Sequence, residues 1–271
     1  MSAIDNVVDR LKDGEWHNLQ DLAKNLKLNQ QKLHEIIQFL LGLDLIKLDE
    51  KQQEAQINTD LKQLITLEQH ANPGSGKIAS IVSQLKPTNH VLFLYESSED
   101  KYNVLFNYLK AGLEDGEAVL YVASEETPNQ IRDAMKRFGV EVEKNEKAGA
   151  LQILGYSDFY ILKGKFNVST TMSLINKLYD EALTKGFKGW RITGEMACFF
   201  EHNLIQELVE YENALHGVFD IPIIGVCAYN VNTLTRAKNP IDLYNELLRA
   251  HGTILFTGTD NELGKIEIRS A

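Results

Sequence analysis

The sequence is poor in cysteine, in proline and in long apolar runs. Its 271 residues include 2 cysteines and 5 prolines. Two cysteines cannot build a disulfide scaffold, and they indicate a reducing compartment. The longest apolar runs, such as residues 91–94, fall far short of the roughly 20 residues that cross a bilayer. The first ten residues contain acids and no apolar stretch, so we expect no signal peptide, no membrane contact and a cytoplasmic protein.

Basic residues are also few. There are 28 Lys and Arg against 38 Asp and Glu, which gives a net charge of −10. This balance counts against a general nucleic-acid coat but allows a small basic patch. The chain is 44% hydrophobic and 24% charged, close to the globular average. At roughly 150 residues per domain, its length predicts one large domain or two ordinary ones.

The N-terminal part, residues 1–66, predicts three helices followed by a hairpin. Apolar residues recur at helical spacing and then alternate in two short strands; the segments are residues 4–11, 19–26 and 33–41 for the helices and 46–48 and 55–57 for the strands. Asn29 can cap the third helix. This order resembles the winged helix-turn-helix domains of archaeal and bacterial regulators.

The third helix of this part supplies the candidate DNA-binding residues, which are Gln30, Gln31, Lys32 and His34. Glutamine can pair with adenine edges and lysine with phosphate. However, residues 1–70 contain 8 Lys and Arg against 12 Asp and Glu, whereas DNA-binding surfaces are usually basic. Two readings stay open: a DNA-binding module, or a module for dimerisation or protein docking.

Residues 67–88 are predicted to be a linker between two domains, with a break at residues 72–76 and then a helical piece over residues 78–85. Residues 73–77, PGSGK, resemble a phosphate-binding loop. The first glycine of that motif is missing, Ile78 replaces its hydroxyl residue, and no strand precedes it. We therefore interpret the segment as a flexible connector.

Residues 89–271 alternate between predicted strands and helices. The strands are 91–95, 118–123, 151–154, 189–193, 221–229, 253–256 and 265–269. This alternation predicts an α/β domain with a mostly parallel sheet and helices on both faces. After the first strand, where a phosphate loop belongs, residues 96–101 hold three acids and no glycine. Such a loop cannot cradle a polyphosphate, so we expect no ATP hydrolysis, no enzyme activity and no cofactor.

Several segments of this domain together resemble the MEDS family, named for methanogens, methylotrophs and the DcmR sensory domain. They are residues 90–95, 116–121, 160–166, 189–196, 211–212, 227–229 and His251. The resemblance implies a RecA- and KaiC-like three-layer domain that has lost the phosphate loop. It also implies sensing of a small organic molecule, proposed for the family to be a hydrocarbon derivative, beside a DNA-binding or signalling module.

The resemblance further implies a strand order. Strand 91–95 would lie between 253–256 and 221–229, with 189–193 beyond. His90 and His251 would then meet at the amino edge of the sheet, with Cys227 on the neighbouring strand. The residues implied at the carboxyl edge, where open α/β sheets bind ligands, are Tyr95, Glu96, Glu125, Glu195 and Asn230.

The candidate ligand-binding residues are His90, Tyr95, Glu96, Glu125, Tyr160, Arg191, Glu195, Cys227, Tyr229 and His251. Several have alternative interpretations. Arg191 could anchor a ligand or form an internal ion pair. The two histidines and Cys227 could contact a ligand, bind a transition metal, or cap strands beside a packed cysteine. Because no local metal-binding spacing supports an ion, we predict no metal.

The sequence favours a one-component transcriptional regulator or a signalling sensor. The α/β domain would bind a small organic ligand, and the winged helix of a homodimer would bind DNA or a partner. One alternative is a KaiC-like ATPase with a degenerate nucleotide site, in which Glu125, Glu126 and Glu195 would act as metal-binding or catalytic acids. The other is a non-catalytic interaction scaffold.

Overall fold

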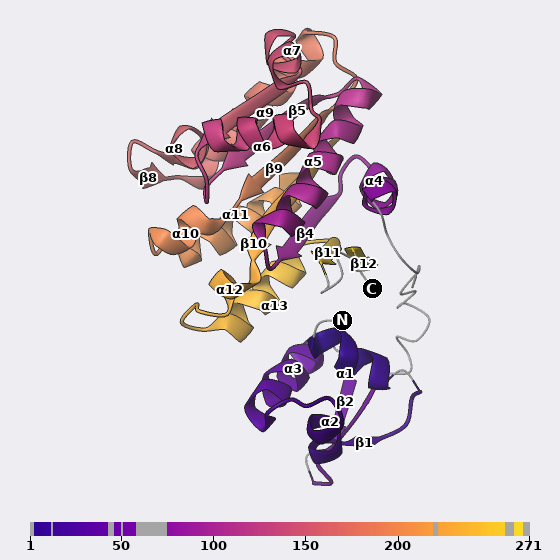
Figure 1. Cartoon of the computed structure of the whole chain (residues 1–271). Coiled ribbons are helices and arrows are strands. Elements are labelled where there is room, and N and C mark those ends of the chain that lie inside the picture. The colour runs from indigo at the N-terminus through magenta and orange to yellow at the C-terminus, as the bar shows by residue number, and fades with distance from the viewer. Residues whose placement is uncertain are drawn as a thin grey trace. The chain divides into compact units, whose positions relative to one another are not determined.

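The computed structural model describes residues 3–11, 13–42, 46–49, 51–57, 75–218, 222–257 and 263–267. The chain divides into two compact units (Figure 1). The first comprises residues 1–71 with 258–266, and the second comprises residues 72–257 with 267–271. Among the described residues, no helix has both the length and the apolar content needed to span a membrane.

The first unit contains three helices and a small antiparallel sheet of strand order β1-β3-β2. Its elements are α1 (Ala3–Leu11), β1 (His17–Asn18), α2 (Leu19–Asn25), α3 (Gln30–Gly42), β2 (Ile46–Asp49) and β3 (Glu54–Ile57). Asn29 caps α3 as expected, since its side chain accepts from the Lys32 amide at 2.7 Å. Apolar side chains from the helices and strands form a separate buried core. The interpretation of this unit as a winged helix stays a prediction.

The second unit alternates strands and helices as the sequence predicts. Its first half contains α4 (Ser75–Ser83), β4 (His90–Tyr95), α5 (Ser98–Asp115), β5 (Ala118–Ala123), α6 (Pro128–Phe138), α7 (Val142–Lys147), β6 (Leu151–Gly155), α8 (Tyr156–Phe159), β7 (Ile161–Leu162) and β8 (Lys165–Phe166). Its second half contains α9 (Val168–Thr184), β9 (Trp190–Glu195), α10 (Ala197–Glu201), α11 (Ile205–Val218), β10 (Ile223–Asn230), α12 (Val231–Leu234), α13 (Pro240–Ala250) and β11 (Thr253–Thr257).

The main sheet has the order β11-β4-β10-β9-β5-β6, with β12 (Leu263–Glu267) beyond β11. The five pairings from β11 to β6 are all parallel. Parallel strands need covering on both faces, and helices supply it: α5 packs with α4 and α6, whereas α11 packs with α9 and α13. Figure 1 shows the helices and the sheet of this α/β layering. The predicted placement of β4 between β11 and β10, with β9 beyond β10, is confirmed.

The start of the second unit contains the helical piece that the sequence predicts, but this helix begins earlier than expected. Helix α4 lies within the expected linker 67–88 and packs against α5. Its Ile78 and Val82 are buried one helical turn apart, as the predicted apolar stripe requires, but the helix already begins at Ser75, inside the expected break. The rest of the expected connector, up to residue 74, lies outside the described residues, as do residues 221 and 268–269 of two expected strands.

Candidate functional site

The carboxyl edge of the sheet is occupied by a buried lysine. Lys101 lies in the first turn of α5, and Ser97 caps that helix by accepting from the Asp100 amide at 3.1 Å. Lys101 is fully buried, as are Val104, Leu105 and Tyr108 on the same stripe of the helix. These positions recur at helical spacing and therefore share one face of α5. Because that face packs onto the sheet, the Lys101 ammonium lies inside the protein.

Three glutamates surround this ammonium. Lys101 Nζ lies 2.8 Å from Glu125 Oε2, 2.6 Å from Glu126 Oε2 and 2.8 Å from Glu195 Oε1. We call these four residues the lysine–glutamate cluster. Glu195 ends β9, whereas Glu125 and Glu126 follow β5, so two neighbouring parallel strands deliver the three carboxylates to one edge.

Hydroxyl and amide donors complete the lysine–glutamate cluster. The three hydroxyl bonds are Tyr95 to Glu125 at 2.7 Å, Tyr102 to Glu126 at 2.9 Å and Tyr121 to Glu195 at 2.5 Å. The amides of Ser124 and Glu125 each donate to Glu195 Oε2 at 2.6 Å. Asn230 donates to Glu125 Oε1 at 3.3 Å. Every carboxylate therefore accepts bonds from the chain itself.

The electrostatics follow from burial and from this pairing. Burial alone would lower the pKa of Lys101, but Glu195, Glu125 and Glu126 outweigh it and raise the pKa above its usual value. Burial raises the pKa of Glu195, and Lys101 offsets only part of that rise. Burial and the Glu126 carboxylate raise the pKa of Tyr102 to about 12. The cluster is thus a hydrogen-bonded ion-pair network in which the lysine stays protonated.

Sequence reasoning located Tyr95, Glu125 and Glu195 correctly at this edge but missed Lys101. The usable signal was a lysine at an apolar position of a helical stripe, three residues before Val104. Glu96, also expected at this edge, follows β4 and is exposed. The structure therefore brings together most, but not all, of the expected carboxyl-edge residues.

A second buried group lies near the amino end of strand β4. It contains His90, Glu212, Cys227 and His251, which we call the histidine–glutamate–cysteine cluster; all four are buried. His90 begins β4 and His251 directly follows α13, so the predicted meeting of the two histidines is confirmed. Their rings lie 3.8 Å apart between centroids.

Glu212 of α11 lies at the centre of this cluster. Its Oε2 is 3.0 Å from His90 Nε2 and 3.4 Å from His251 Nε2. Cys227 Sγ lies 3.5 Å from His90 Nε2, and the Tyr229 hydroxyl donates to Glu212 Oε1. Glu212 was noted in the sequence only as part of the Tyr211–Glu212 pair. Its signal was an acid between Leu208 and Leu215 on the apolar face of a helix.

The pKa values in this cluster reflect the same burial. Burial, followed by the neighbouring His251, lowers the pKa of His90 to about 4. Burial alone would raise the pKa of Glu212, but the two histidines outweigh it and hold that pKa well below its usual range. Burial raises the pKa of the Cys227 thiol.

Arg191 forms an internal ion pair, which is one of the two interpretations that the sequence left open. Its guanidinium pairs with Glu117, lies 3.0 Å from Asp115 Oδ2 and donates to the Tyr108 carbonyl at 3.4 Å. Arg191 is 3% exposed. Its donors are therefore used within the protein, and it belongs to neither cluster.

Tyr160 lines a small internal cavity of about 10 Å³, roughly the space of one water. The cavity lies among β9, β10, α9 and α11, and its lining residues are Tyr160, Ile175, Ile192, Gly194, Tyr211, Leu215, Ile223, Gly225, Val226 and Cys227. A Cβ at Gly194 would lie 1.9 Å from the Tyr160 hydroxyl oxygen, so only glycine allows this close approach. The lining contains no charged side chain.

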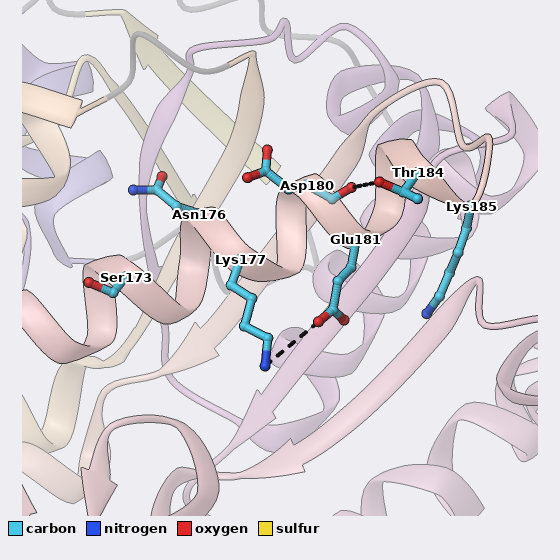
Figure 2. Close-up of a pocket in the computed structure, with 7 residues that line it drawn as sticks. All are labelled: Ser173, Asn176, Lys177, Asp180, Glu181, Thr184 and Lys185. Atoms are coloured by element: carbon cyan, nitrogen blue, oxygen red, sulfur yellow. Dashed lines mark hydrogen bonds and ion pairs between the residues drawn. The ribbon is translucent and has the colours of Figure 1, made fainter.

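A larger hollow runs along α9 (Figure 2). It is lined by Ser173, Asn176, Lys177, Asp180, Glu181, Thr184 and Lys185. Lys177 pairs with Glu181 at 3.7 Å, and the Thr184 hydroxyl donates to the Asp180 carbonyl at 2.8 Å. Because one helix and the residue after it supply the whole lining, no groups converge there from different elements.

The predicted DNA-binding residues lie in the first unit, at the start of α3. Gln30, Gln31, Lys32 and His34 are all exposed. Lys32 Nζ lies 3.7 Å from Glu35 on the same helix. The four side chains are thus accessible on one short stretch of the helix, and their role stays a prediction.

Together, the mostly parallel sheet and the helices packed on it define a three-layer α/β domain, and the loop after its first strand β4 contains no glycine. Residues 89–251 match the family described as the methanogen/methylotroph, DcmR sensory domain, abbreviated MEDS. This match covers more than half of the chain, so the protein belongs to the MEDS family. The expected family is confirmed.

Solved structures resemble the fold at low sequence identity. A KaiC-like protein from Pyrococcus horikoshii is 18% identical, with 68% of this chain and 81% of that chain covered and a TM-score of 0.47. The flagellar accessory protein FlaH from Methanocaldococcus jannaschii is 11% identical, with 72% and 83% covered and a TM-score of 0.49. No curated protein matches the sequence.

Proposed function

We propose that the protein is a ligand-responsive regulator. Its MEDS domain binds a small organic molecule, and its N-terminal unit binds DNA or a protein partner, with the chain acting as a homodimer. The observation that carries this proposal is the match of residues 89–251 to a sensory-domain family. Regulation then requires that the ligand bind two states of the protein with different affinity.

The lysine–glutamate cluster argues against the ATPase alternative. An ATPase needs backbone amides and a cation to hold phosphates, and carboxylates free to hold magnesium. Here Lys101 lies within 2.8 Å of all three candidate carboxylates. The protein's own ammonium therefore takes the place of a bound cation, and the loop after β4 contributes acids.

The cavity beside Gly194 is the ligand site that we propose. Its lining is aliphatic and aromatic, with two tyrosines and the Cys227 thiol, and it contains no Lys, Arg, His, Asp or Glu side chain. Because burying an unpaired charge is costly, the ligand should be neutral. A cavity of about 10 Å³ requires the ligand to have few heavy atoms and to displace a side chain, for which the Tyr160 ring against Gly194 is the candidate.

A thermal-shift screen of the full chain tests this proposal. Short alcohols, aldehydes, thiols and halogenated methanes form one panel, and ATP with magnesium forms the other. A ligand at about 100 times its Kd stabilises the native state by about 2.7 kcal/mol. We expect a saturable rise in Tm with a neutral organic compound and none with ATP. A rise with ATP and magnesium would instead support the ATPase alternative.

Two glycine variants test whether the organic ligand binds in the cavity beside Gly194. Gly194→Ala places a methyl group against Tyr160 and should remove the Tm rise caused by the organic ligand. Gly155→Ala is the matched control, since its Cβ would lie 3.6 Å from the nearest atoms, the Pro128 Cγ and the Ser157 Oγ, which is an ordinary contact. An equal rise in both variants would place the ligand outside this cavity.

DNA binding by the N-terminal unit is the second part of the proposal. Lys32→Ala should weaken binding to a selected duplex and reduce its salt dependence by about one phosphate contact. Lys110→Ala removes the same charge from an exposed position in the other unit and serves as the control. Absence of duplex binding by the unmodified chain would favour a docked protein partner.

A further inference from the structure

The two histidines of the histidine–glutamate–cysteine cluster have defined tautomers. His90 Nδ1 lies 2.8 Å from the Ala250 carbonyl oxygen, and His251 Nδ1 lies 2.6 Å from the Leu247 carbonyl oxygen. A carbonyl oxygen only accepts, so each Nδ1 carries the proton and donates it. In the neutral rings, both Nε2 atoms therefore present lone pairs.

These lone pairs are directed at a carboxylate. Both Nε2 atoms lie within 3.4 Å of Glu212 Oε2. Neither Glu212 Oε2 nor His251 Nε2 makes a hydrogen bond to any residue that the structure describes. A single proton serves only one of these two contacts, and protonating both rings would stack two cations 3.8 Å apart. One protonated ring would pair with Glu212 but leave the other Nε2 unbonded, whereas a single metal ion can be bonded by all of these atoms at once.

Three of the six separations between the proposed ligand atoms are close to those around a tetrahedral metal ion. Zinc binds nitrogen and oxygen at about 2.0–2.2 Å and sulfur at about 2.3 Å, which separates neighbouring ligand atoms by about 3.3–3.6 Å. The corresponding separations are 3.0 and 3.4 Å from nitrogen to oxygen and 3.5 Å from His90 Nε2 to Cys227 Sγ. All four ligand atoms lie within 4.8 Å of one another.

The charge also balances. A divalent ion bound by one thiolate, one carboxylate and two neutral imidazoles has no net charge, which suits a fully buried site. The ion displaces the Cys227 thiol proton, which leaves to solvent. The carbonyls that accept from the two Nδ1 atoms, and the Tyr229 hydroxyl on Glu212 Oε1, are the outer hydrogen bonds that usually orient metal ligands.

We propose that His90, Glu212, Cys227 and His251 bind one divalent transition-metal ion, with Zn²⁺ as the representative. Four protein ligands leave no open coordination position, so the ion is structural or regulatory rather than catalytic. It joins β4, β10, α11 and the chain that follows α13. This inference does not depend on the proposed ligand-sensing function, and it departs from the sequence prediction of no metal.

Cobalt substitution tests the site on the full, untagged chain. After removal of metal by a chelator, we expect one equivalent of Co²⁺ to bind and to give the intense visible bands of a tetrahedral site with a thiolate-to-cobalt charge-transfer band. Zn²⁺ should displace it stoichiometrically. X-ray absorption of the Zn²⁺-loaded wild type should show one sulfur and three nitrogen or oxygen ligands, which tests the ligand set without any substitution.

Two cysteine variants test whether Cys227 supplies the sulfur ligand of the metal ion. Cys227→Ser should lose the charge-transfer band and weaken metal binding by more than about 100-fold, beyond the effect of an outer-ligand change. Cys198→Ser alters the other buried free cysteine and should leave both unchanged. The proposal is wrong if the metal-free chain binds no stoichiometric Co²⁺ or Zn²⁺, if the absorption spectrum shows no sulfur ligand, or if Cys198→Ser removes the band.

Discussion

The two buried clusters of the MEDS domain solve the same electrostatic problem differently. Near the carboxyl edge, three glutamates share the ammonium of Lys101, which the chain itself supplies. In the other cluster, Glu212 faces two imidazoles and a thiol, and no lysine or arginine is within ion-pair distance among the described residues. Buried charge requires a partner. The first cluster therefore contains a permanent cation of its own, whereas the second contains only imidazoles, and there we propose a bound metal ion.

The largest effect should come from removing the internal cation. Lys101→Met leaves Glu195 buried without its counter-charge, and breaking a buried ion pair in this way costs about 3–5 kcal/mol. Urea unfolding monitored by circular dichroism measures the loss. Lys110→Met is the control, because Lys110 is 46% exposed and lies 3.9 Å from Glu114 on the same helix. Its cost should stay below about 1 kcal/mol, and equal losses would contradict a special role for Lys101.

The next largest effect should come from adding Zn²⁺, which we expect to act through only one of the two clusters. Zn²⁺ at about 100 times its Kd should raise the free energy of unfolding of the metal-free wild type by about 2.7 kcal/mol. Glu212→Gln should lose this gain, because it removes a metal ligand. Glu195→Gln should keep the gain while being less stable with or without Zn²⁺, since it leaves Lys101 with fewer carboxylates. Loss of the gain in Glu195→Gln alone would place the ion in the lysine–glutamate cluster.

A matched pair of tyrosine variants sharpens the comparison. Tyr121→Phe and Tyr229→Phe each remove a hydroxyl that donates to a buried carboxylate. Each should lower the free energy of unfolding by about 1–2 kcal/mol. Only Tyr229→Phe should also weaken Zn²⁺ binding, by about 10-fold or more, because its hydroxyl orients a metal ligand. Competition with a coloured chelator measures that affinity, and equal Zn²⁺ affinities in the two variants would argue against the assignment.

The smallest effect is expected at Glu96. This residue is exposed at the end of β4, outside both clusters. Glu96→Gln should change the free energy of unfolding by less than about 0.5 kcal/mol and leave Zn²⁺ affinity unchanged. Thermal unfolding with and without Zn²⁺ checks both values. A loss comparable to that of Lys101→Met would show that the cluster at this edge extends to the exposed loop.

Sequence reasoning was most successful with the sheet and least successful with the helices. The strands are short apolar runs, and their order followed from the family resemblance, so His90, His251 and Cys227 were correctly placed together. Lys101 and Glu212 were missed as site residues. Each lies on a helix among apolar neighbours and is buried. Charged residues on helices are usually exposed, so the sequence alone does not show that these two face the sheet.

The sequence by itself determined the α/β alternation, the absence of a phosphate loop and the edge of the sheet to which each strand delivers its terminal residue. These are local properties, because hydrophobic periodicity and chain direction need no information about distant segments. Only the tertiary structure decided that Lys101 pairs with three glutamates, that Arg191 pairs internally, and that Glu212 lies between two histidines. Charge partners are chosen by packing between elements far apart in the chain, since the energy of a buried charge depends on its three-dimensional surroundings.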